Sequence, residues 1–254
     1  MKKTWILAWN TVRESFRKKT TYIIILFALI MIAASEFFAF LSAQEQTKMI
    51  MDTSFAVIEF FGFLLAMFGS ITAVSSEIEK RTIYTLLTKP ITRTNFILGK
   101  YLGMFFILLI NFVIMTIFFL LLIHFKKIPI NIAIFKTLFL IFMELLVIAS
   151  ISLALATFTS DAFNIIASCF LYIIGHLTSY GRQVIEMTKN IVIKGLADMM
   201  YTILPNYQNF SIRDKVVVGI PVPWQYVLIV TGYGIMYIVI ALLIGIYFFR
   251  TREI

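Results

Sequence analysis

Six long apolar segments dominate the sequence, and each is close to the length of about 20 residues that a helix needs to cross a hydrocarbon core of about 30 Å. They cover residues 20–41, 55–74, 101–123, 132–158, 163–179 and 224–249. Hydrophobic residues make up 61% of the chain and charged residues only 14%, against about 25% charged residues in soluble domains. The chain is therefore expected to be an all-α integral membrane protein with six transmembrane helices in a single domain over residues 1–254.

The distribution of lysine and arginine between the loops predicts the orientation of these spans. Thirteen of the 22 basic residues lie before the first span, between the second and third spans, or after the sixth. Cytoplasmic loops carry such an excess, so both termini are expected to lie in the cytoplasm. The Lys126–Lys127 pair, on the predicted outer side, fits this pattern poorly.

Two segments outside the spans have patterns of their own. In residues 1–19, Trp5, Ala8, Trp9, Val12 and Phe16 recur every three or four positions. This spacing predicts a helix lying in the cytoplasmic interface with Trp5 and Trp9 as anchors, and the alternative is a plain basic flank. Residues 180–223 form a long extracytoplasmic segment, in which residues 182–201 are expected to form an interfacial helix and the apolar stretch 216–220 is too short to span.

Sequence motifs for catalysis are missing from the chain. It has no G-x-x-x-x-G-K-[ST] phosphate loop, no H-E-x-x-H and no G-x-S-x-G, so no catalytic residue is assigned. The two histidines, His124 and His176, are expected near the outer surface, and no spacing in the sequence indicates a metal site. No cofactor is therefore expected in this chain.

Three polar residues within the apolar segments require an explanation, namely Glu144, Asn111 and Glu59. A charge at the centre of a bilayer costs about 2.5–3.5 kcal/mol or more on insertion scales. One interpretation places Glu144 on a translocation path or a subunit interface. The other makes it a protonated residue that hydrogen-bonds to Asn111 and joins two helices. The sequence leaves both open.

The loop between the second and third spans, residues 75–100, is more elaborate than a connector requires. Ser75 or Ser76 is expected to cap a short cytoplasmic helix that has acidic residues in its first turn and ends before Pro90. A firmly bounded charged helix of this kind suits docking onto a soluble partner. The Gly99-x-x-x-Gly103 pattern that follows predicts close helix contact within one subunit.

This loop resembles that of a known family, the membrane permease subunits of type-2 ATP-binding-cassette (ABC) exporters. The matching residues are Glu77, Glu79, Thr82, Leu86, Leu87, Pro90, Arg93, Gly99 and Lys100. Six spans, cytoplasmic termini and a long outer segment before the last span also match. One departure is Arg81, which stands where many members have glycine.

The resemblance implies a function and a set of partners. Such permeases work in pairs, as homodimers or heterodimers, each docked on an ABC ATPase subunit that carries the ATP and Mg²⁺. The residues expected to couple to the ATPase are Glu77, Glu79, Lys80, Arg81 and Thr82. The expected location is the cell inner membrane, in contact with lipid and with no nucleic acid partner. Two alternatives are a membrane scaffold that moves an external partner and an intramembrane enzyme.

Overall fold

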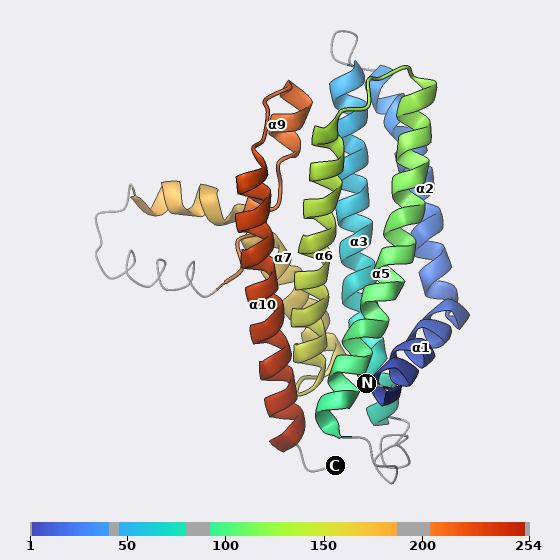
Figure 1. Ribbon diagram of the computed structural model, residues 1–254, viewed down its shortest axis with the longest axis vertical. Coiled ribbons are helices and arrows are strands. Elements are labelled where there is room, and N and C mark those ends of the chain that lie inside the picture. Colours follow the sequence, from blue (N-terminus) through green and yellow to red (C-terminus); the bar gives the residue numbers. More distant parts are fainter. Residues whose placement is uncertain (1, 41–45, 80–91, 187–203, 252–254) are drawn as a thin grey trace.

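The computed structural model describes residues 2–40, 46–79, 92–186 and 204–251, and within these ranges every regular element is a helix (Figure 1). Predictions for the remaining residues lie outside the described ranges. They include the part of the expected interfacial helix from residue 187 onward. The expected all-α membrane fold is confirmed. The elements are α1 (Lys2–Arg17), α2 (Lys19–Phe40), α3 (Gln46–Glu79), α5 (Arg93–Phe125), α6 (Ile132–Ala156), α7 (Asp161–Glu186), the 3-10 turn η1 (Tyr207–Asn209), α9 (Arg213–Val218) and α10 (Trp224–Thr251).

Each of the six apolar segments corresponds to one helix. Segment 132–158 runs two residues beyond α6, and residue 41 of the first segment lies outside the described residues. Among the described residues, α3, α5, α6, α7 and α10 are long and apolar enough to cross a membrane. A sixth span is reached if α1 and α2, which meet at an angle of 66°, are counted as one. The 22 residues of α2 contain most of the expected first span.

Helix α6 lies in the middle of the bundle and is in contact with α3, α5, α7 and α10. Its approach to α3 is especially close, because a Cβ atom on Gly62 would overlap the side chain of Leu145. Farther along the same contact, the Ser70 hydroxyl donates to the carbonyl of Ala149 at 3.1 Å. This contact fixes how the two helices are aligned along their length.

Small polar residues hold α7 to α6. The side-chain amide of Asn164 donates to the Ser152 carbonyl at 2.9 Å, and the Ser168 hydroxyl donates to the amide oxygen of Asn164 at 3.0 Å. All three side chains are buried. A single hydrogen bond between spans adds only about 0.6 kcal/mol of stability on average. Such bonds also satisfy polar groups to which lipid chains offer no hydrogen-bond partner.

The N-terminal helix α1 packs against α5 through the two glycines of the G-x-x-x-G pattern, as expected within one subunit. An added Cβ would lie 2.7 Å from the Leu7 Cβ at Gly99 and 2.6 Å from the Thr11 Cβ at Gly103. Trp5 and Trp9 remain 56% and 63% exposed. This outward placement suits the anchoring role expected of them, which stays a prediction.

The expected helix start at Ser75 or Ser76 is wrong. Helix α3 continues without a break from Gln46 to Glu79, and its 34 residues make it about 51 Å long, well beyond a hydrocarbon core of about 30 Å. Helix α5 begins at Arg93, earlier than the expected span, because the Thr92 hydroxyl caps it by accepting from the Asn95 amide at 3.2 Å.

Part of the long segment before α10 folds back between the helices instead of remaining outside. Tyr207 and Phe210 are fully buried, and a Cβ on Gly175 of α7 would overlap the ring of Tyr207. The Asn206 amide donates to the Tyr233 hydroxyl at 2.8 Å. Covered in this way, irregular backbone is tolerated at membrane depth.

Residues 216–218 of the short apolar stretch 216–220 belong to helix α9, which lies at the end of the bundle opposite the two termini (Figure 1). Gly219 ends this helix in the left-handed region at φ 84°, a conformation that costs glycine little. After α9 the chain continues through Pro221 and Pro223 to α10.

Contacts at the same end of the bundle explain why basic residues are tolerated on the expected outer side. Lys126 forms an ion pair with Glu36 of α2. Lys136 is buried at the start of α6, where its ammonium donates to the Val222 carbonyl at 2.7 Å and lies 4.5 Å from the centre of the Trp224 ring. Both ammonium groups therefore have partners within the chain.

The contact between α1 and α5 generates a stability prediction. Gly103→Ala is expected to destabilise the protein by about 1–3 kcal/mol, because the new methyl group collides with Thr11 and with the Ala8 carbonyl. Thermal unfolding in detergent measures the effect. Gly232→Ala is the matched control, since a Cβ there meets nothing within 4 Å, and equal melting temperatures for the two variants would contradict the assigned contact.

Candidate functional site

The C-terminal end of α3 and the N-terminal end of α5 are joined by an ion pair between Glu77 and Lys100. Lys100 is among the most deeply buried large side chains, at 1% exposure, and its ammonium lies 5.6 Å from the centre of the Phe96 ring. A buried lysine needs a partner that holds its charge. Glu77 provides it, so the two helices that flank residues 80–91 are fixed to each other.

The start of α5 is also joined to the end of α10. The Arg93 guanidinium donates to the carbonyls of Phe249 and Arg250 at 2.9 and 2.8 Å, where the negative end of a helix dipole favours a cation. In return, Arg250 donates to the Thr94 hydroxyl at 2.9 Å. The Phe96 and Phe249 rings stack beside these contacts, with centroids 5.1 Å apart.

Only part of the expected ATPase-coupling set falls within the described residues. Glu77 pairs with Lys100 inside the chain, and Glu79 is the last residue of α3. Lys80, Arg81 and Thr82 lie outside the described residues. The pairing of Glu77 with Lys100 escaped sequence reasoning because the two residues are 23 positions apart.

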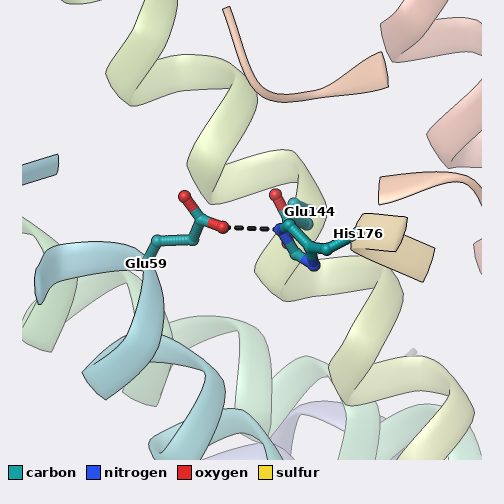
Figure 2. Close-up of side chains that lie close together, drawn as sticks. All are labelled: Glu59, Glu144 and His176. Carbon is teal, nitrogen blue, oxygen red and sulfur yellow. Dashed lines mark hydrogen bonds and ion pairs between the residues drawn. The ribbon is translucent and has the colours of Figure 1, made fainter. Parts of the chain in front are cut away.

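A second group of polar side chains lies inside the bundle, where Glu59 of α3, Glu144 of α6 and His176 of α7 converge (Figure 2). The His176 Nε2 atom lies 2.6 Å from Glu59 Oε1 and 3.4 Å from Glu144 Oε1. One ligand atom from each residue lies within 4.8 Å of the other two. We call these three residues the Glu-Glu-His cluster.

Two neighbours extend this cluster. The Tyr172 hydroxyl donates to Glu59 Oε1 at 3.4 Å, and the His176 Nδ1–H donates to the Tyr172 carbonyl at 3.0 Å. Arg213, at the start of α9, lies 3.6 Å from Glu59 Oε2 and 3.6 Å from Asp52. Arg213 thus connects the cluster to the expected outer end of α3.

Glu144 is less well satisfied than Glu59. It is completely buried, and neither of its carboxyl oxygens has a hydrogen-bond partner among the described residues. The expected bond to Asn111 is not formed, since the Asn111 amide donates at 2.6 Å to Ile107, one turn away on its own helix. Of the three intramembrane candidates, the structure therefore brings Glu59 and Glu144 together and leaves Asn111 apart.

Comparison with known proteins identifies the family. Residues 31–254 match the model of the ABC-2 family transporter protein. The chain belongs to the ABC-2 transporter family. No curated protein matches the sequence significantly. Membership makes this chain a multi-pass permease subunit of an ABC transporter, and it agrees with the resemblance read from residues 75–103.

In this ABC-2 permease, the residues that sequence reasoning missed are those whose partners lie on other elements. His176 was expected at the surface and Arg213 had no assigned role, yet both contact Glu59. The sequence signal for His176 was its position directly after Gly175 within a short apolar span. It became meaningful only when α3, α6 and α7 were seen to converge.

The ion pair between Glu77 and Lys100 leads to a second prediction. Lys100→Met is expected to cost about 1–3 kcal/mol of stability, because Glu77 loses a buried charged partner. The double variant with Glu77→Gln should recover part of the loss, as a double-mutant cycle in chemical denaturation would show.

Lys126→Met is the matched control for this cycle. It removes a lysine from a pair whose side chains are 40% and 55% exposed, and exposed pairs contribute at most about 1 kcal/mol. A Lys100 variant no less stable than the Lys126 variant would contradict the role assigned to the buried pair.

Proposed function

We propose that this chain is the membrane half of an ATP-driven exporter, working as one of a pair of permeases. A separate ABC ATPase subunit binds ATP and Mg²⁺, and hydrolysis there drives movement of a substrate through the paired spans. On this proposal the chain itself is not catalytic, and it resides in the cell inner membrane with both termini in the cytoplasm.

The observation that carries the coupling role is the set of contacts around the cytoplasmic ends of three long helices. Residues 80–91 connect α3 to α5, and these helices are held by Glu77 and Lys100. Arg93 and its neighbours hold α5 to the end of α10. A displacement applied to the connecting residues would therefore be delivered to α3, α5 and α10 together.

The buried cluster supports a transport role for the middle of the bundle. Glu59 and Glu144 come from two different spans and face each other across the α3–α6 contact (Figure 2). Intramembrane ionisable residues are costly and commonly mark substrate or ion pathways. We place the translocation path beside these two residues. No observation favours the scaffold alternative over transport.

The test of ATPase coupling is affinity purification of the tagged chain from native membranes in mild detergent, followed by mass spectrometry. Wild-type protein should recover an ATPase that carries a phosphate-loop motif. Glu79→Lys and Arg81→Glu should each reduce that recovery at least tenfold, because reversal places like charges against the partner's surface. Tenfold corresponds to about 1.4 kcal/mol.

Lys127→Glu, in the turn between α5 and α6 at the other end of the bundle, serves as the control and should leave ATPase recovery unchanged. If wild-type chain recovers no such ATPase, the proposed partnership is wrong. If it does but both loop variants recover as much as wild type, docking occurs elsewhere on the chain.

Topology generates a further prediction. In a Cys169→Ser background, which removes the single native cysteine, new cysteines at Lys3 and Arg252 should react with a membrane-impermeant maleimide only after the cells are opened. A cysteine at Lys48 or Lys127 should react in intact cells. Labelling in the reverse pattern would overturn the expected orientation.

A further inference from the structure

The Glu-Glu-His cluster has the composition of a metal site although nothing in the spacing of its residues along the sequence indicates one. Its donors are a carboxylate from α3, a carboxylate from α6 and an imidazole from α7, and none of the three is more than 22% exposed. In Figure 2 the three side chains point toward one another.

The imidazole is oriented as a metal ligand would be. A carbonyl oxygen can only accept, so the contact of His176 Nδ1 with the Tyr172 carbonyl places a hydrogen on Nδ1. In neutral imidazole this leaves the lone pair on Nε2, and Nε2 is the atom that faces both carboxylates. Metal-bound histidines nearly always donate their other ring N–H in this way.

The carboxylates are not satisfied by the protein groups around them. Glu144 is wholly buried, and neither Glu144 oxygen nor Glu59 Oε2 has a hydrogen-bond partner within the described part of the chain. Arg213 approaches only the Glu59 oxygen, at 3.6 Å, and divides its charge between Glu59 and two aspartates. A buried carboxylate without donors either holds a proton or pairs with a cation, and a cation between Glu59, Glu144 and His176 would serve both carboxylates at once.

The donor set selects the kind of cation. Ca²⁺ takes six to eight oxygen ligands, and Mg²⁺ demands octahedral oxygen coordination, whereas one imidazole and two carboxylates suit a borderline transition metal. Tetrahedral Zn²⁺ with bonds of about 2.0–2.1 Å places its donor atoms ~3.3 Å apart. The separation of His176 Nε2 from Glu144 Oε1 is 3.4 Å, and the 2.6 Å contact with Glu59 Oε1 would widen to admit the ion.

Acidic residues near the cluster provide an approach from the end of the bundle that carries α9. A surface depression there is lined by Lys48, Met49, Asp52, Thr53, Asp214, Val217 and Val218. Asp52 also contacts Arg213, which in turn contacts Glu59. On this route Asp52 and Asp214 offer carboxylates, with Lys48 and Arg213 as the neighbouring positive charges.

We propose that Glu59, Glu144 and His176 form a binding site for one divalent transition-metal ion of the Zn²⁺ type. Three protein ligands leave the fourth position of a tetrahedral ion open to water or another small ligand. Binding displaces the proton shared by Glu59 Oε1 and His176 Nε2, which leaves to solvent, and replaces their hydrogen bond by two metal–ligand bonds. The ion also supplies a positive charge beside Glu144. The proposal concerns the chain alone and does not depend on the ATPase.

The experiment uses the full chain, purified in detergent, freed of metal with a chelator and dialysed against ZnCl₂. Metal content by mass spectrometry should approach one Zn²⁺ per chain, and titration calorimetry should give a single class of sites. Glu144→Gln keeps the size of the side chain but removes a charged ligand, and it should weaken Zn²⁺ binding at least 100-fold. His176→Gln should do the same.

Matched controls separate this site from other ligands in the chain. His124→Gln removes the other histidine and Cys169→Ser the single thiol, and both variants should bind Zn²⁺ as wild type does. If Glu144→Gln fails to fold, wild-type protein still decides the question through Co²⁺, whose visible absorption reports four-coordinate binding. Wild-type chain that binds neither ion, or a Glu144→Gln variant that binds Zn²⁺ normally, overturns the proposal.

Discussion

The close contact between α3 and α6 is the interaction on which the arrangement of this membrane protein most depends. Gly62 allows Leu145 to lie directly against the α3 backbone, and the Ser70 hydroxyl is bonded to Ala149 farther along. Lipid offers no hydrophobic force to drive helices together, so small residues and interhelical hydrogen bonds have to provide the attraction. Because Glu59 precedes Gly62 by one turn and Glu144 adjoins Leu145, the same contact places the two carboxylates opposite each other.

The two ends of the bundle are held by different chemistry. At the end that carries the two termini, the buried Lys100 pairs with Glu77 between α3 and α5, and the half-buried Arg93 joins α5 to α10. Such pairs hold one geometry, since either partner alone would leave a buried charge uncompensated. At the other end, the segment 204–223 covers the bundle with aromatic side chains and brings Arg213 over Glu59.

Much of the fold followed from the sequence. The length of each apolar segment determined where the helices lie, because backbone groups in hydrocarbon must be satisfied within a helix. The G-x-x-x-G contact between α5 and α1 was also predictable, since residues four apart lie on one face. The helix expected to begin near Ser75 was misplaced because a serine before acidic residues also occurs within a continuing helix, as it does in α3.

The sequence by itself determined that this chain is a multi-span membrane protein, and residues 75–103 indicated its transporter family. Both depend on local properties, namely hydropathy over about 20 residues and one contiguous motif. Only the tertiary structure decided the partners of the buried charges. It paired Glu77 with Lys100 and brought Glu59, Glu144 and His176 together from three helices. Sequence spacing carries no information on such contacts, because they depend on how separate helices are aligned along their length and turned toward one another.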